Sequence, residues 1–185
     1  MTMSLGHSIN FKGHTPVWLY DYLGILEPKE GDELDLAGQK FIQRKGILRN
    51  QLLLSENQAQ TEKIFDFKWK KENTFDSQAS LSRMRLWLIE RYGDISTADW
   101  LIDHGENPIL IDAGCGAAMS TLELFGNLIP KVRYLGVDVS SAIDVAAKRF
   151  AERGLQGTFM QADINKPPLP INSVDLIFSE GALHH

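Results

Sequence analysis

From residue 109 onward, short apolar runs alternate with amphipathic stretches. The apolar runs predict strands over 109–111, 131–137, 158–162 and 174–178. Between the first three runs, apolar residues recur at helical spacing, as at Ile143, Ala146, Ala147 and Phe150. Ser141 and Asp144 resemble a cap for the helix that contains these four residues. The alternation of strands and helices predicts a parallel sheet with right-handed crossovers.

The pattern before residue 109 is less regular and predicts a small irregular or helical N-terminal region. The apolar and aromatic residues 16–26 predict a turn of helix, and the apolar residues on either side of Ala37-Gly38 predict a small hairpin. Ser80 or Ser82 can cap a helix that runs to Tyr92, with Gly93 past its end.

Another short helix is predicted from a possible capping box formed by Ser96 and Asp99. We therefore divide the chain into an appendage (1–66), an aromatic strap with helices (67–105) and a Rossmann-like domain (106–185).

Composition narrows the classes of partner. Hydrophobic residues make up 43% and charged residues 23%, and the formal net charge is −5. This acidity gives no electrostatic reason to expect nucleic acid or an anionic membrane as a partner, and no apolar run approaches the length of a bilayer span. The single cysteine, Cys115, cannot make a structural zinc site by itself, so we predict no metal. A cytoplasmic location is the default expectation.

Aromatic residues and lysines interleave between residues 65 and 75. Such a segment can bind single-stranded nucleic acid by stacking, or it can pack against the main domain. The acidity of the chain favours packing.

The stretch most informative about chemistry follows the first predicted strand. Ile109, Leu110 and Ile111 lead into Asp112, and Gly114 and Gly116 then open a helical pattern. The two glycines allow a tight turn and a close approach of the backbone to a ligand. This arrangement predicts a site for a nucleotide-like cofactor.

Acidic residues fall at the carboxyl ends of all four predicted strands: Asp112, Asp138, Asp163 and Glu180. Ligands of open parallel sheets bind at this edge. Asp138 lies 22 residues beyond Gly116, where a carboxylate can accept hydrogen bonds from ribose hydroxyls.

Two classes of cofactor use this geometry. A dinucleotide site has a third glycine or alanine where this chain has Met119, and its pyrophosphate would be repelled by Asp112. S-adenosylmethionine carries an ammonium and a sulfonium instead, which suit a nearby carboxylate. Met119 and Asp112 therefore favour S-adenosylmethionine over a nicotinamide or flavin dinucleotide.

Four motifs in order resemble class I S-adenosylmethionine-dependent methyltransferases of the small-molecule branch. They are Asp112-Ala-Gly-Cys-Gly116, Tyr134-Leu-Gly-Val-Asp-Val-Ser140, Gln161-Ala-Asp-Ile164, and the stretch from Pro168 through Ser179 and Glu180 to His185. The resemblance covers residues 106–185 and implies a sheet with strand order 3-2-1-4 and helices on both faces.

The resemblance also implies which residues bind the cofactor. They are Asp112, Gly114, Cys115, Gly116, Asp138, Val139, Asp163, Ile164, Ser179 and Glu180. One departure is Ala118, where the family often has a third glycine, so that a methyl group narrows the cofactor turn.

The implied reaction is methyl transfer to an oxygen, nitrogen or carbon of a small molecule. His184 is a candidate base; it could also line the pocket or belong to a disordered chain end. The alternatives are a nicotinamide- or flavin-dependent oxidoreductase and a non-catalytic cofactor-binding remnant.

The first part of the chain is similar to a leader found before some of these methyltransferases. The similar segments are Lys45–Arg49, Phe67–Trp69, Phe75–Ser77 and Ser82–Arg83. That leader often begins with a zinc ribbon; with no cysteine before Cys115, this one must be metal-free. The resemblance makes Trp69 a candidate lid residue, although packing is the simpler role.

The chain ends just after the fourth predicted strand, whereas the family's sheet continues. We therefore expect an apolar edge strand and a substrate half that is missing from this chain.

Overall fold

The computed structural model describes residues 18–52, 77–97, 105 and 107–182. The helices are α1 (Trp18–Leu23), α4 (Gln78–Tyr92), α5 (Met119–Phe125) and α6 (Ala142–Glu152), with short 3-10 helices η1 (Ile95–Thr97) and η3 (Ile129–Lys131). The strands are β1 (Glu33–Leu36), β2 (Gln39–Arg44), β3 (Ile47–Asn50), β4 (Ile109–Ala113), β5 (Arg133–Asp138), β6 (Thr158–Gln161) and β7 (Leu176–Phe178).

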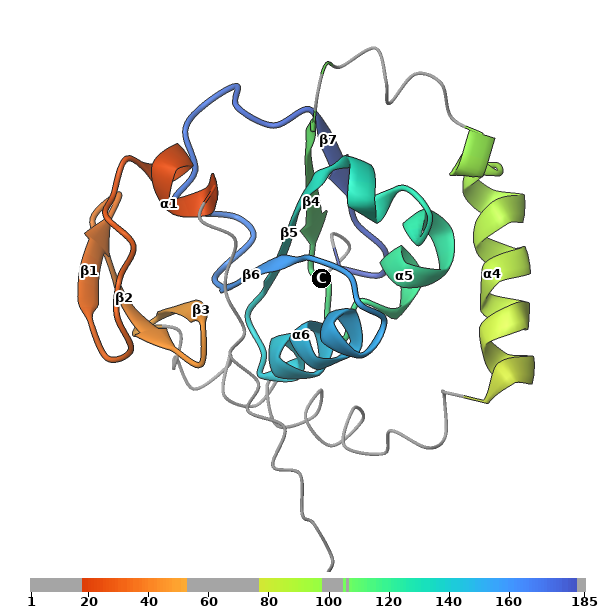
Figure 1. Ribbon diagram of the computed structural model, residues 1–185, viewed down its shortest axis with the longest axis horizontal. Coiled ribbons are helices and arrows are strands. Elements are labelled where there is room, and N and C mark those ends of the chain that lie inside the picture. The colour runs from red at the N-terminus through yellow and green to blue at the C-terminus, as the bar shows by residue number, and fades with distance from the viewer. Residues whose placement is uncertain (1–17, 53–76, 98–104, 106, 183–185) are drawn as a thin grey trace, which may run out of the picture.

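One sheet of seven strands, in the order β1-β2-β3-β6-β5-β4-β7, organises these elements (Figure 1). The strands β6, β5, β4 and β7 are parallel. They are the four strands predicted from the alternating pattern, and their order confirms 3-2-1-4. All five residues of β4 are buried, as expected for a strand covered on both faces.

The structure corrects the prediction that the N-terminal region is irregular or helical. Residues 33–50 form an antiparallel meander, whose third strand pairs in parallel with β6 through Leu48 and Arg49. The first turn, Ala37-Gly38, was predicted; the second, Lys45-Gly46, was not. All four turn residues have positive φ, which suits a tight hairpin turn. The meander therefore extends the sheet and covers the edge of β6.

Helices lie on both faces of the sheet, as predicted. On one face α4, α5 and α6 bury a cluster that includes Leu88, Leu122 and Phe150. On the other face, Leu19 and Tyr20 of α1 pack over residues of β4, β5 and β6. In Figure 1 the meander and α4 lie at opposite ends of the molecule.

Two predicted helix caps are corrected. The N-cap of α4 is Ser77, whose Oγ accepts a hydrogen bond from the Ser80 N–H, whereas Ser80 and Ser82 lie inside the helix. Ser141 is the N-cap of α6 but makes no capping hydrogen bond through its side chain. Asp144, expected to complete that cap, pairs with Arg49 instead.

The outer edge of β7 matches the predicted apolar edge strand. Ile177 is 64% exposed at the centre of this strand. Its neighbour Phe178 is buried against α5, because side chains alternate between the two faces of a strand.

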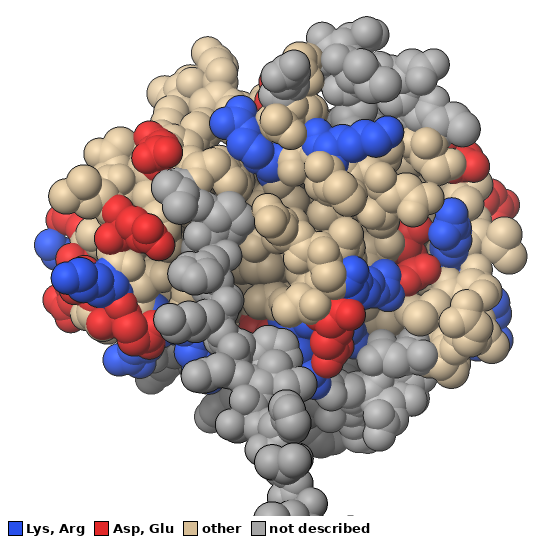
Figure 2. Space-filling view, viewed as in Figure 1, with Lys and Arg blue, Asp and Glu red and all other residues tan. Residues whose placement is uncertain are grey.

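Charges of both signs are scattered over the face shown in Figure 2, and several acidic side chains lie at its left, over the β1–β2 hairpin. Lys40 and Asp35 form an exposed ion pair there. In the part of the chain that is described, no helix is both long and apolar enough to cross a membrane.

Arg49 ties the meander to the Rossmann-like part of the sheet. Its guanidinium donates to both carboxylate oxygens of Asp144, at 2.7 and 3.2 Å, and to Oε1 of Gln161 at 2.9 Å. The Gln161 amide in turn donates to the carbonyl of Val139. One side chain of β3 thus contacts α6 and β6 together.

We predict that the Arg49–Asp144 pair stabilises the fold measurably. In a double-mutant cycle of Arg49→Ala and Asp144→Ala, the coupling free energy of unfolding should be about 1–2 kcal/mol, because the bond is bidentate and the Arg49 side chain is only 14% exposed. Urea denaturation measures it. The same cycle on the exposed Lys40–Asp35 pair is the control and should give a smaller coupling; equal couplings would contradict the prediction.

Candidate cofactor site

The turn after β4 is held in a left-handed backbone conformation. Gly114 has φ +76° and Gly116 has φ +51°. The N–H groups of Gly114 and Cys115 both donate to the carbonyl of Val137 on β5, at 2.8 and 3.1 Å. The turn is therefore fixed to the neighbouring strand, as the predicted role of the two glycines requires.

Ala118 shows why a third glycine is common at its position. It has φ +57° and ψ +25° as the N-cap of α5, and it is almost fully buried. A methyl group here carries left-handed strain that glycine would not.

Asp138 links the end of β5 to the glycine turn. One carboxylate oxygen accepts the N–H of Gly116 at 2.7 Å, and the other accepts the N–H and the hydroxyl of Ser140 at 2.8 and 2.7 Å. A carboxylate offers about four acceptor positions, so roughly one stays open for a ribose hydroxyl. The half-buried Asp138 thus has room for about one hydrogen bond from a ribose hydroxyl, and its contact with a cofactor stays a prediction.

Asp112 lies on the α5 side of β4 and is only 3% exposed. Its Oδ2 accepts hydrogen bonds from the hydroxyls of Thr121 and Tyr134. Burial raises the pKa of Asp112 to about 6, although both hydrogen bonds oppose the shift. This carboxylate joins β4, β5 and α5, and its predicted contact with the cofactor stays a prediction.

Cys115 is buried in the turn, and the structure gives no reason to consider it a nucleophile. Burial, with Asp112 and Asp138 nearby, raises the pKa of its thiol well above the usual value.

The predicted adenine-binding residues follow β6. Asp163 and Ile164 are half-buried, and Asp163 accepts hydrogen bonds from the backbone and side chain of Asn165. Val139 is likewise half-buried, just after Asp138. The parallel pairing of β5 with β6 places Asp138 opposite Gln161, so these residues share one edge of the sheet with the glycine turn.

The segment after β7 packs directly on that turn. Ser179 Oγ donates to the carbonyl of Ala113 at 2.7 Å. A Cβ added to Gly114 would lie 2.2 Å from Cβ of Ala182. The carboxylate of Glu180 accepts a hydrogen bond from the hydroxyl of Tyr92, at the end of α4.

Sequence reasoning missed four residues that hold this edge together: Thr121, Tyr134, Gln161 and Tyr92. Tyr134 and Gln161 are inside the quoted motifs, but the motifs do not indicate that Tyr134 bonds to Asp112 or that Gln161 bonds to Arg49. The candidate lid residue Trp69 and the candidate base His184 lie outside the described residues.

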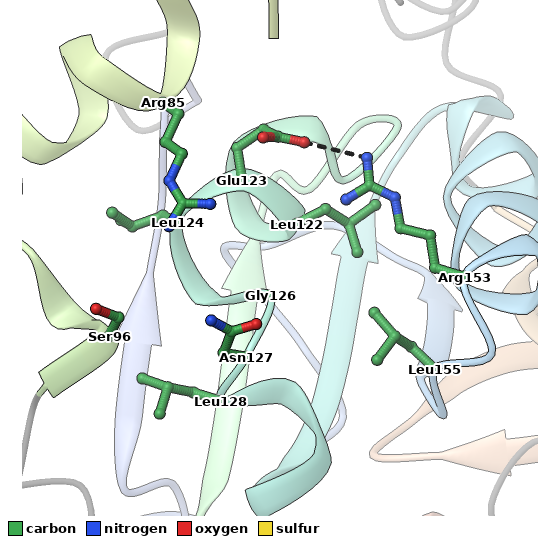
Figure 3. Close-up of a pocket in the computed structure, with 10 residues that line it drawn as sticks. All are labelled: Arg85, Ser96, Leu122, Glu123, Leu124, Gly126, Asn127, Leu128, Arg153 and Leu155. Atoms are coloured by element: carbon green, nitrogen blue, oxygen red, sulfur yellow. Dashed lines mark hydrogen bonds and ion pairs between the residues drawn. The ribbon is translucent and has the colours of Figure 1, made fainter. Parts of the chain in front are cut away.

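A cavity of about 260 Å³ lies between α4 and α5, away from the glycine turn (Figure 3). Figure 3 shows Arg85 reaching down from α4 toward Leu124, while the Arg153 guanidinium points to Glu123. That second pair is an ion pair of 3.1 Å. Because the charge of Arg153 is compensated by Glu123, the two arginines do not make this cavity a strongly positive site for an anion.

Residues 110–185 match the family model of a methyltransferase domain. The match supports a class I methyltransferase fold for this part of the chain, as predicted from the motifs. A comparison with curated proteins gave no match.

The solved structures to which part of this chain is similar include methyltransferases. A geranyl diphosphate C-methyltransferase from Streptomyces coelicolor A3(2), in complex with S-adenosyl-L-homocysteine, is 24% identical; the similarity covers 47% of this chain and 34% of that one, with a TM-score of 0.37. An S-adenosylmethionine-dependent methyltransferase from Aquifex aeolicus is 27% identical; the similarity covers 44% of this chain and 45% of that one, with a TM-score of 0.35. The plantazolicin methyltransferase BpumL is 21% identical; the similarity covers 64% of this chain and 40% of that one, with a TM-score of 0.36. The chain spans less than half the length of each.

The buried carboxyl of Asp112 predicts a pH-dependent stability. Since its pKa is raised from 3.8 to about 6, folding favours the protonated form, so its contribution to stability falls as the pH rises from about 4 to 6 and is constant above. Asp112→Asn should therefore be more stable than the parent chain at pH 7.5, by at most about 3 kcal/mol, and nearly equal to it at pH 4.

Urea denaturation at both pH values measures the difference. Asp35→Asn is the control, because Lys40 lowers the pKa of Asp35 and the pH trend should have the opposite sign. A difference for Asp112→Asn that is the same at pH 4 and 7.5 would contradict the prediction.

Gly114→Ala should destabilise the fold by about 2–4 kcal/mol, because its methyl would combine left-handed strain with a clash against Ala182. Gly24→Ala is the matched control: Gly24 has a similar φ of +68°, but a Cβ there meets nothing within 4 Å, so about 1 kcal/mol is expected. Unfolding free energies from urea denaturation compare the two, and equal losses would count against the close packing of Ala182.

Proposed function

We propose that this chain binds S-adenosylmethionine at the carboxyl edge of β4, β5 and β6, and that it takes part in methyl transfer to a small-molecule oxygen, nitrogen or carbon. The observation that carries the proposal is the Asp138 carboxylate, which bridges β5 to the glycine turn and keeps an acceptor position open. The methyltransferase-domain match over residues 110–185 supports the reaction class.

When bound, S-adenosylmethionine supplies a methyl group on a sulfonium, which is already activated for displacement. The work left to the protein is to position the two reactants and exclude water. In this proposal Asp138 and Val139 hold the ribose, and Asp163 and Ile164 hold the adenine.

The backbone of Gly114, Cys115 and Gly116, together with Asp112, would hold the methionine part of the cofactor. Ser179 and Glu180 border the same region, from the segment that packs on the turn. His184 stays the candidate base for an acceptor that carries a proton. The small-molecule class of the acceptor rests on the resemblance of residues 168–185.

Calorimetric titration with S-adenosylhomocysteine tests the proposal. Asp138→Asn should weaken binding by about 1.5–3 kcal/mol, or roughly 10- to 150-fold, because a hydrogen bond to a charged group is lost. Asp32→Asn is the control, since Asp32 accepts a local turn hydrogen bond from Lys29, and it should leave the affinity unchanged.

Titration with NAD separates the alternatives. Binding of NAD but not of S-adenosylhomocysteine would replace the proposal with an oxidoreductase. Tight binding of S-adenosylhomocysteine without methyl transfer to any acceptor tried would favour a non-catalytic cofactor-binding domain.

A further inference from the structure

Tyr92, the last residue of α4, is held at both ends of its side chain. Its hydroxyl donates to the carboxylate of Glu180, and its ring packs edge-on against Phe178 with centroids 5.7 Å apart. Phe178 in turn packs against Phe125 of α5, at 5.2 Å. The Tyr92 ring is therefore part of an aromatic row that connects α4, β7 and α5.

The Tyr92 hydroxyl lies between a carboxylate and a guanidinium. The hydrogen bond to Glu180 is the largest cause that raises the pKa of Tyr92, and Arg91 opposes this shift. The guanidinium of Arg91 lies 5.6 Å from the Tyr92 ring and 5.4 Å from the Trp87 ring. The C-terminal turn of α4 thus presents one oriented donor to the segment after β7.

That segment is the one that packs on the glycine turn. Ser179 donates a hydrogen bond to the carbonyl of Ala113 at the end of β4, and Ala182 packs against Gly114. Glu180 lies between Ser179 and Ala182 in the chain. Because both of these residues contact the glycine turn, a hydrogen bond to the Glu180 carboxylate restrains the middle of this short segment.

We infer that Tyr92 is a positioning residue of the cofactor site: it holds Glu180 and, through it, residues 179–182 against the glycine turn. This inference rests on the proposed function for its effect on cofactor affinity. The order that it imposes on residues 179–182 does not depend on any ligand. The helix α4, outside the matched methyltransferase domain, thereby becomes part of the site.

Hydrogen exchange of the full chain without ligand is the first test. Tyr92→Phe keeps the ring and its contact with Phe178 but removes the donor. Amide exchange in residues 179–182 should become about three- to tenfold faster, as expected for one lost hydrogen bond. Unchanged exchange in this segment would overturn the inference, whether or not the chain binds a cofactor.

Tyr22→Phe is the matched control. The Tyr22 hydroxyl also joins an N-terminal helix to a segment near β7, by a 2.9 Å hydrogen bond to the carbonyl of Ser173. This variant should leave exchange in residues 179–182 unchanged, so it separates a specific effect from the loss of any tyrosine hydroxyl.

Calorimetry with S-adenosylhomocysteine is the second test. Tyr92→Phe should weaken binding about three- to tenfold, while Tyr22→Phe should not. The double variant Tyr92→Phe, Glu180→Gln should bind no more weakly than Glu180→Gln alone, since Tyr92 acts through Glu180.

The outcomes keep the two proposals apart. Binding by the parent chain with no loss in Tyr92→Phe would overturn the positioning role and leave the proposed function standing. No binding by the parent chain, with faster exchange in Tyr92→Phe, would reject the proposed function and leave the structural part of the inference standing.

Discussion

The left-handed turn between β4 and α5 is the constraint on which the rest of the site depends. Its N–H groups bond to the end of β5 at the Val137 carbonyl and the Asp138 carboxylate. Beneath it, the buried Asp112 accepts hydrogen bonds from the hydroxyls of Thr121 on α5 and Tyr134 on β5. A carboxylate in this position is costly unless it is hydrogen-bonded, and the hydroxyls of Thr121 and Tyr134 reduce that cost.

The N-terminal meander gives this sheet its second distinctive feature. β3 pairs with β6 and so protects one edge of the parallel strands, while Arg49 reaches across to α6 and Gln161. Gln161 lies opposite Asp138 in the register of β5 and β6. The meander therefore supports the same edge of the sheet that carries the ribose and adenine residues of the proposed site.

The segment after β7 brings a third part of the chain to the glycine turn. Tyr92 and Glu180 are 88 positions apart, yet their hydrogen bond and the packing of Ala182 on Gly114 join α4, β7 and β4 at one place. Residues from outside the matched methyltransferase domain thus lie on both flanks of the proposed site, with Arg49 on one side and Tyr92 on the other.

The sequence by itself determined the four parallel strands, the helices between the first three and the glycine turn, because hydrophobic periodicity and the glycine and aspartate spacings are local signals. The order of the strands was implied by the resemblance to the methyltransferase family and not by these local signals. The sequence also indicated the methyltransferase family. Only the tertiary structure decided that Asp144 pairs with Arg49 rather than capping its helix, that Asp112 is buried under α5, and that Tyr92 bonds to Glu180. These contacts join residues far apart in the chain, and a hydrogen bond between distant residues leaves no periodic trace in the sequence.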